Sequence, residues 1–267
     1  MPINAETILQ LLKQTANSHQ GKLKERVDER LDERERRVLK WLFEQYEDES
    51  KRRWYDPYHI LFSTNFALRL VEEEKLDRLI VPGIILHDIG YFALEDKSQW
   101  SAKESRITHM QEGVPLAARV LCENEFSPLE IEKILGMISV HDNPYIGLSI
   151  HGRDRLGLRD CDRIWVMHLL SFYKDLTSKS EGGGLQKEFL HDRMTQFYGW
   201  KHPFENEWEI TIERVIRNAP RIEIPTYNFT QEYVKKQFKH RLQELESDVL
   251  SDADKFRAYL NVQIDKE

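Results

Sequence analysis

The sequence predicts an all-α fold, on three observations. Apolar residues return at helical spacing through most of the chain, several segments open with N-cap and proline signals, and no convincing run of alternating strand residues occurs. We expect a helical metal-binding domain at residues 51–180, an N-terminal helical extension at 1–50 and a C-terminal helical extension at 181–267 that packs on the core. The polar, glycine-rich stretch at 177–184 marks the clearest break.

The first predicted helix covers residues 22–46, where a few apolar side chains recur among many charged ones: Val27, Leu31, Val38, Leu42 and Tyr46. Their returns, at three to four residues or multiples of these, are typical of an amphipathic helix. The run KERVDERLDERERR alternates in sign, and we interpret it as a solvated helix surface.

A second helix is predicted to open at Asp56-Pro57, with Asp as the cap and Pro in the first turn. It carries His59, Phe62, Phe66 and Leu70 on its inward face. The next segment, residues 79–87, is apolar on every side and is predicted to be a buried central helix. A buried strand is the alternative, but it has no companion strands.

Helix signals continue along the chain. Ser127, Pro128 and Glu130 fit an N-cap, an N1 proline and a capping-box glutamate, and this helix leads to His141. A helix is expected from about Asp162 to residue 174. Further helices are expected near 185–198, 205–217, 231–246 and 252–263.

The composition is that of a globular protein with a charged surface: 40% hydrophobic and 32% charged residues over 267 positions, with a net charge of -7. This balance gives no reason to expect a nucleic acid or an anionic membrane as partner. The amino terminus lacks the apolar core of a signal peptide, and two cysteines make a disulfide framework improbable. We therefore expect a cytoplasmic protein.

Chemistry-bearing residues centre on one His-Asp dipeptide. Three such dipeptides occur, and His87-Asp88 ends the most apolar helix, directly before Ile89-Gly90. Ionisable groups at the end of a buried helix are costly unless something compensates them, and a metal ion would do so. His191-Asp192, by contrast, has charged neighbours and is interpreted as surface. Four more residues lie near the ends of predicted helices and could converge on the dipeptide: His59, His109, His141 and Asp162.

The order H…HD…H…H…D, with HDIGY, HMQEG and DCDRIW at its members, resembles the HD-domain metal-dependent phosphohydrolase superfamily over about residues 55–175. The resemblance implies that His59, His87, Asp88 and Asp162 hold one metal, while Asp88 bridges to a second held by His109 and His141. Asp160 is the alternative to Asp162, but Cys161-Asp162-Arg163 fits the family pattern better. Four His and two Asp suit iron, manganese or zinc, with magnesium a further candidate.

The resemblance implies hydrolysis of a phosphoric ester in a small phosphorylated molecule or nucleotide, through a metal-activated hydroxide. Arg159 and Arg163 are candidates for holding phosphate oxygens, as are Arg153 and Arg155 in the loop expected after His141; each could equally be a solvated surface arginine. Asp142 could orient a histidine or transfer a proton, or make a helix-end hydrogen bond.

Some features depart from the family. Several members carry Lys three residues after the HD aspartate, where this chain has Tyr91, and the Gly-Tyr-Pro signature of the HD-GYP phosphodiesterases does not occur. Two other functions stay open: a di-iron oxygenase of the same superfamily, and a non-catalytic regulatory module that retains a metal site. The helix at 22–46 and the C-terminal helices could serve a homodimer, or simply cover the bundle.

Overall fold

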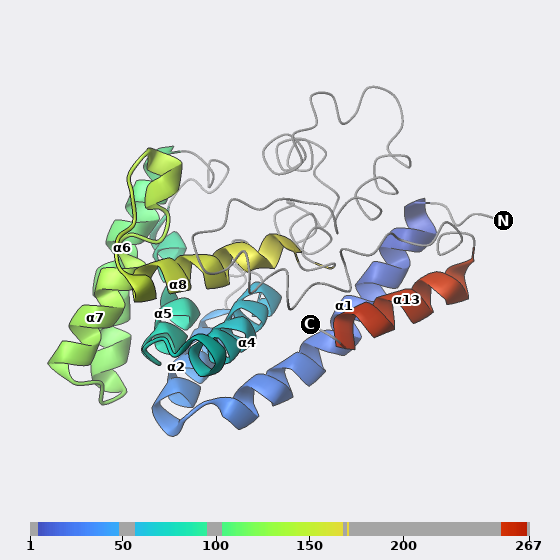
Figure 1. The fold of residues 1–267 in the computed structure, drawn as a ribbon, viewed down its shortest axis with the longest axis horizontal. Helices are drawn as coiled ribbons and strands as arrows, with labels where there is room; N and C mark the ends of the chain where they lie inside the picture. The colour runs from blue at the N-terminus through green and yellow to red at the C-terminus, as the bar shows by residue number, and fades with distance from the viewer. Residues whose placement is uncertain (1–4, 48–56, 95–102, 168–169, 171–251, 266–267) are drawn as a thin grey trace. The chain divides into compact units, whose positions relative to one another are not determined.

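The fold is described from a computed structural model, and the structure describes residues 5–47, 57–94, 103–167, 170 and 252–265. Its helices are α1 (Ala5–Arg30), α2 (Glu33–Gln45), α4 (Pro57–Glu74), α5 (Ile80–Leu86), α6 (Lys103–Glu123), α7 (Pro128–Ile138), α8 (Arg153–Arg163) and α13 (Ala253–Asp265), with short 3-10 helices η1 (Ile89–Ala93), η2 (Asn143–Ile146) and η3 (Ile164–Met167) (Figure 1). All regular elements among these residues are helical, which confirms the all-α prediction for the described part of the chain.

The chain divides into two compact units. One is Leu23–Arg163, which contains every described residue of the predicted metal site. The other combines Met1–Lys22 with Ile164–Glu267. The predicted domain boundaries, near residues 50 and 180, and the helices expected at 185–198, 205–217 and 231–246 lie outside the described residues and stay predictions.

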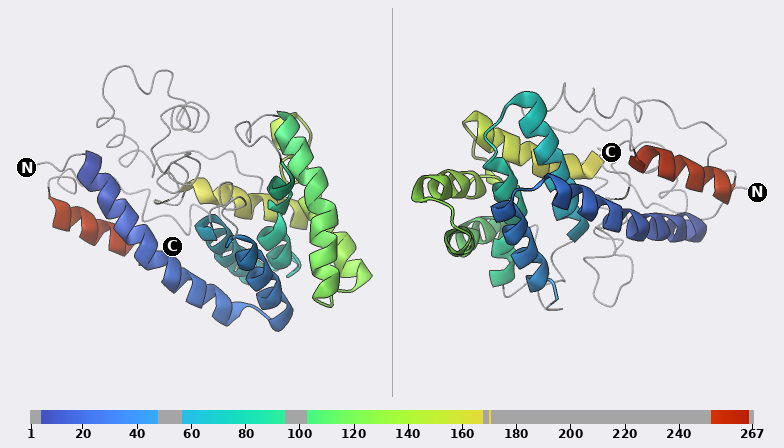
Figure 2. Two further views of the ribbon diagram at one scale, coloured as in Figure 1. Left: turned by 180° about the vertical axis from the view of Figure 1, so that it is seen from behind. Right: turned by 90° about the horizontal axis from the view of Figure 1, so that it is seen from below.

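Helix α5 is the centre of the Leu23–Arg163 unit. All seven of its residues are buried, and it packs against α2, α4, α7 and α8. Figure 2 shows these helices from behind and from below. A segment that is apolar on every side can be stable only where neighbours cover every side, so the prediction of a buried central helix is confirmed and the strand alternative is wrong.

Two other predicted helices are confirmed, α7 with its N-terminal cap and α4 with its buried face. Helix α7 begins at Pro128 behind Ser127, whose hydroxyl and backbone form a reciprocal capping box with Glu130. In α4, the predicted inward residues Phe62, Phe66 and Leu70 are buried.

The predicted single helix at 22–46 is wrong, because the chain breaks at Leu31 and Asp32 between α1 and α2. Asp32 caps α2: its carboxylate accepts from the Glu35 backbone N–H at 2.8 Å, and the Glu35 carboxylate accepts from the Asp32 backbone N–H at 2.8 Å. This capping box lies inside the charged run that we interpreted as continuous helix surface. The predicted apolar positions are nonetheless buried.

The helix predicted to start at about Asp162 is also misplaced. Asp162 lies near the end of α8, which begins at Arg153, and η3 follows it. Arg153 and Arg155 therefore lie in the first turn of a helix and not in a loop. The inward face of α8 is short, with Leu158 and Cys161 fully buried, and the polar residues around it concealed the helical period.

The second unit contributes α13, which confirms the helix expected near 252–263. The Asp252 carboxylate accepts from the backbone N–H groups of Asp254 and Lys255, at 2.8 and 3.2 Å, and so caps the helix. Phe256 and Leu260, one turn apart, are fully buried.

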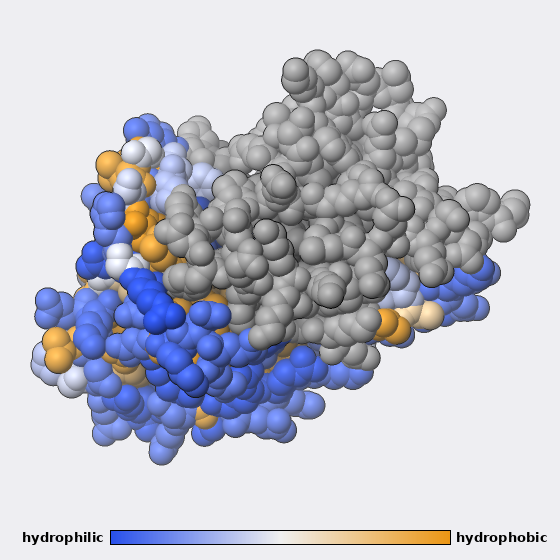
Figure 3. Space-filling model, in the orientation of Figure 1, coloured by the Kyte–Doolittle hydropathy of each residue, from blue (hydrophilic) through white to orange (hydrophobic). Residues whose placement is uncertain are grey.

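The surface and the helix lengths agree with the composition. The described residues on the face drawn in Figure 3 are mostly hydrophilic, with small, scattered hydrophobic areas. No helix among the described residues is both long and apolar enough to cross a membrane.

Gly90 permits the close approach of η1 to α6. A Cβ atom at Gly90 would lie 1.8 Å from the His109 carbonyl oxygen and 2.6 Å from the Gly113 backbone nitrogen. These are backbone atoms, which cannot move aside as a flexible side chain could. The glycine two residues after Asp88 thus brings the His-Asp dipeptide against the helix that carries His109.

Gly90→Ala is expected to lower the free energy of unfolding by at least about 2 kcal/mol, because η1 must move away from α6. Gly21→Ala is the matched control: no atom lies within 4 Å of its Cβ position in α1, and alanine there should stabilise by about 0.5–1 kcal/mol. Urea denaturation of both variants measures the difference. Equal stability of Gly90→Ala and the unaltered protein would contradict the close approach.

Candidate metal centre

Six side chains from five elements meet in the Leu23–Arg163 unit. His59 lies in the first turn of α4, His87 and Asp88 lie between α5 and η1, and His109 lies in the second turn of α6. His141 follows the end of α7, and Asp162 lies in the last turn of α8. The structure therefore brings together all six residues that the sequence nominated as metal ligands.

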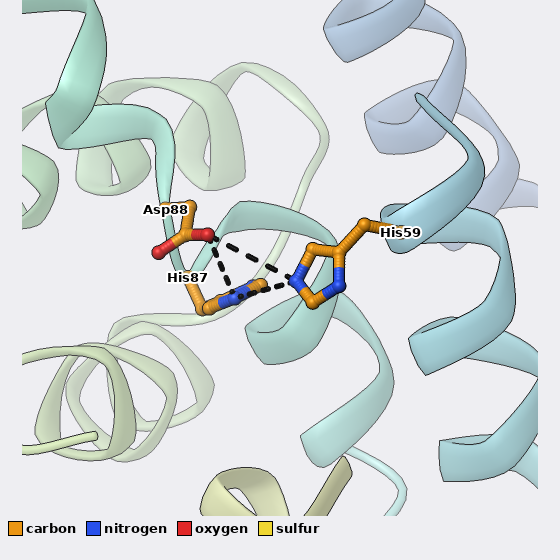
Figure 4. A group of neighbouring side chains, drawn as sticks. All are labelled: His59, His87 and Asp88. Atoms are coloured by element: carbon orange, nitrogen blue, oxygen red, sulfur yellow. Dashed lines mark hydrogen bonds and ion pairs between the residues drawn. The ribbon is translucent and has the colours of Figure 1, made fainter. Parts of the chain in front are cut away.

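The first group consists of His59, His87, Asp88 and Asp162. Figure 4 shows His59 reaching from α4 toward the adjacent His87 and Asp88. The Nε2 atoms of His59 and His87 are 3.4 Å apart, and Asp88 Oδ2 lies 4.0 and 3.1 Å from them, respectively. Asp162 Oδ1 lies 3.4 Å from His59 Nε2 and 3.5 Å from His87 Nε2. Asp162 thus faces both histidines of this group, and the ligand atoms of His59, His87 and Asp88 all lie within 4.8 Å of one another.

The second group consists of Asp88, His109 and His141. The Nε2 atoms of the two histidines are 3.1 Å apart. Asp88 Oδ1 lies 3.6 Å from His109 Nε2 and 3.4 Å from His141 Nε2. Asp88 therefore belongs to both groups, with one carboxylate oxygen directed at each.

These spacings fit metal coordination. With metal–ligand bonds of about 2.1 Å, adjacent ligand atoms stand about 3.0 Å apart in an octahedron and about 3.4 Å apart in a tetrahedron. The separations given above, from 3.1 to 4.0 Å, fall at or slightly above these values. Both His59–His87–Asp88 and Asp88–His109–His141 could each hold a metal ion.

Backbone carbonyls set the orientation of three imidazoles. The Nδ1 atoms of His87, His109 and His141 face the carbonyl oxygens of Ile84, Ser105 and Ile138, at 2.7, 3.2 and 2.7 Å. A carbonyl can only accept, so each Nδ1 must donate, and in the neutral ring the lone pair is then on Nε2. The Nε2 lone pairs of His109 and His141 point into one space, where a cation is the group that they can share.

The two carboxylates are held in their ionised form. Burial raises the pKa of Asp88, but His87 and His141 outweigh burial and hold that pKa well below its usual value. Burial likewise raises the pKa of Asp162, and hydrogen bonds from His59 and His87 reverse the effect, so its pKa is also well below the usual value. Both groups are therefore anionic ligands at neutral pH.

The histidines differ from one another. Burial, followed by the neighbouring His141, lowers the pKa of His109 to about 4, so its ring is neutral at pH 7. Burial also lowers the pKa of His87, but Asp88 and Asp162 more than compensate and raise that pKa well above its usual value. In the protein without metal, His87 therefore carries a proton that a metal ion would have to displace.

A layer of charged side chains surrounds the centre. Asp142 pairs with Arg106 through Oδ2 at 2.5 Å and with Arg159 through Oδ1 at 2.6 Å. The same Arg159 Nη1 lies 2.9 Å from Asp162 Oδ2. Burial raises the pKa of Asp142, but Arg159 and Arg106 lower it overall, so this carboxylate is ionised and bound to two arginines.

Two tyrosines pack against these groups. The Tyr91 ring is stacked on His109, with centroids 4.1 Å apart and planes 5° apart. The Tyr145 ring has the guanidinium carbons of Arg106, Arg159 and Arg163 at 3.7, 4.7 and 5.4 Å from its centroid. Arg163 also donates a hydrogen bond to the Tyr145 hydroxyl.

The structure separates the outer candidates. Arg159 and Arg163 are beside the centre, and Asp142 is paired with arginines. Arg153, in contrast, is exposed and donates to the Glu74 carbonyl at 2.5 Å, and Arg155 is exposed next to Gly136. Cys161 is buried, and His191-Asp192 lies outside the described residues.

Sequence reasoning missed Arg106 and Tyr145. Arg106 precedes His109 by three residues on α6, a spacing that places both on one helix face, and this was the available signal. Tyr145 gave none, because its role depends on how η2 folds back on α6.

Comparison with protein-family models, with curated proteins and with solved structures finds no match. The geometry of the centre and the resemblance of the sequence motifs to HD-domain proteins are therefore the basis for proposing a function.

Asp162→Asn is expected to lower metal content at the first group, because an amide cannot supply the anionic oxygen that faces His59 and His87. Asp160→Asn, a change of the same kind at a buried position two residues away on α8, is the control and should retain the metal content of the unaltered protein. Elemental analysis after dialysis against zinc distinguishes them. The reverse order would assign the ligand to Asp160.

Metal binding should release protons near neutral pH. Because the pKa of His87 is raised well above its usual value in the metal-free protein, zinc must displace about one proton from that ring. The affinity should therefore rise with pH through the neutral range. Calorimetric titration in two buffers of different ionisation enthalpy counts the protons; identical heats in both buffers would contradict the prediction.

Proposed function

We propose that this protein is a metal-dependent phosphohydrolase of the HD-domain type, which uses two divalent ions to cleave a phosphoric ester in a small phosphorylated molecule. The observation that carries the proposal is the position of Asp88, whose two oxygens face two different histidine pairs. One carboxylate shared between two groups that could each hold a metal ion is the arrangement that a dinuclear hydrolytic centre requires.

The donor set fits the metals that the sequence nominates. Imidazole nitrogen together with carboxylate oxygen suits iron, manganese or zinc better than calcium. Two such ions, when bound, would make a coordinated water more acidic and neutralise charge on phosphoryl oxygens. Catalysis of phosphoryl transfer depends mainly on positioning the reacting groups and on stabilising the charge of the transition state.

The chain's own residues would divide the remaining work. Arg159 holds Asp142 and Asp162 together, so in this proposal it orients a metal ligand instead of binding phosphate. Asp142 is ionised and paired with two arginines, which favours an orienting role over proton transfer. Arg163, next to Asp162, is the candidate for contact with phosphate oxygens.

The charge around the centre supports an anionic substrate. Three guanidinium groups gather at Tyr145, within 5.4 Å of its ring centroid. Arg106 and Arg159 pair with Asp142, and Arg159 also pairs with Asp162. Guanidinium groups match the geometry of phosphate oxygens, so their place beside the centre suits a phosphate better than a neutral polyol.

Manganese-loaded protein is expected to release phosphate or phosphate monoester from a panel of phosphomonoesters and phosphodiesters that includes nucleotides. Asp88→Asn should abolish turnover, because it removes the shared anionic ligand. Asp254→Asn, at an exposed position on α13, is the charge-matched control and should retain full turnover.

Two results would overturn the proposal. Substrate-dependent oxygen uptake by the iron-loaded protein, without phosphate release, would assign it to the oxygenases that use a similar ligand set. Full metal occupancy with no turnover in either assay would assign it to the non-catalytic modules.

A further inference from the structure

Arg106 lies beside the second group without belonging to it, since it contacts Asp142, the residue that follows His141. It precedes His109 by one helical turn on α6, and its side chain is 12% exposed. Its Nη1 donates to Asp142 Oδ2 at 2.5 Å. Because Asp142 directly follows His141 in the chain, this single ion pair links the helix that carries one histidine to the turn that carries the other.

The ion pair is held in a fixed geometry. The Arg106 guanidinium carbon lies 3.7 Å above the centroid of the Tyr145 ring, which restricts the plane of the guanidinium. The other oxygen of Asp142 accepts from Arg159 at 2.6 Å. Asp142 is therefore clamped from two sides, and its Oδ2 lies 3.8 Å from His109 Nε2.

The backbone contacts of His109 and His141 do not set the distance between the two rings. The Nδ1 atom of His109 bonds within α6, to Ser105, and that of His141 bonds to Ile138 of α7. Each contact orients one ring on its own element. Neither fixes the distance between the elements, which the Arg106–Asp142 pair spans.

We infer that Arg106 is a positioning residue for the second metal, acting through Asp142 to keep His109 and His141 at coordinating distance. The inference rests on the two-metal centre of the proposed function and adds a residue that controls filling of one of its positions. The first group has its own support, since Arg159 contacts Asp162 directly, so loss of Arg106 acts on the second position.

The sign of the effect separates positioning from simple electrostatics. Arg106 is a cation beside the place of another cation, so its charge alone opposes metal binding. If charge were its only contribution, Arg106→Gln would tighten binding of the second metal. A positioning role requires the opposite result.

The test is a titration of metal-free protein with zinc alone, followed by calorimetry and by elemental analysis. For Arg106→Gln we expect the dissociation constant of zinc at the second group to rise about 10- to 100-fold, as for other groups that support metal ligands. The dissociation constant at the first group should be unchanged. We call these the second and the first constant. Arg119→Gln removes the same charge from an exposed site on the same helix and should leave both constants unchanged.

Melting of the metal-free variants shows whether Arg106→Gln folds. If it does not, Arg106→Lys, which can still pair with Asp142 but cannot stack flat on Tyr145, takes its place with the same expected direction. An unchanged or smaller second constant, or equal weakening of both, overturns the inference. If unaltered protein binds two zinc ions in that case, the dinuclear proposal stands; if it binds fewer than two, both fail together.

Discussion

The arrangement of the centre depends on the carboxylate of Asp88, whose two oxygens face two different groups of histidines. Asp88 leaves the end of α5 as the chain turns into η1, and its two oxygens face histidines from α4 and α5 on one side and from α6 and the turn after α7 on the other. Four imidazoles and two carboxylates close together would be unfavourable without a compensating charge. A cation held by such a group would supply that charge, and Asp88 belongs to both groups that could hold one.

Burial makes this arrangement rigid. Helix α5 is covered on every side, so the end that carries His87 and Asp88 has a fixed place in the unit. Gly90 then allows η1 to lie against α6 at backbone distance, which any larger residue would prevent. The histidines use carbonyls of their own helices to orient their rings, and the metal-facing nitrogens are left directed inward.

The charged layer outside the centre shows how buried arginines can support anionic ligands. Arg159 bridges Asp142 and Asp162, and Arg106 completes the pairing of Asp142. These four side chains each have a partner of opposite sign, which limits the cost of desolvation. The same layer places guanidinium groups beside the centre, and the proposal of a phosphorylated substrate depends on this feature.

The sequence by itself determined the helical class, the buried character of α5, the cap of α7 and the identity of six candidate ligands. These follow from local signals: period, proline and cap residues, and a dipeptide of ionisable groups after an apolar helix. The break at Asp32 also has a local cause, its capping box with Glu35, which the periodicity did not reveal. Tertiary structure decided the start of α8 at Arg153 and the roles of Arg106 and Tyr145. Those outcomes depend on contacts between helices that are far apart in the sequence, and the local spacing of apolar residues does not reveal such contacts.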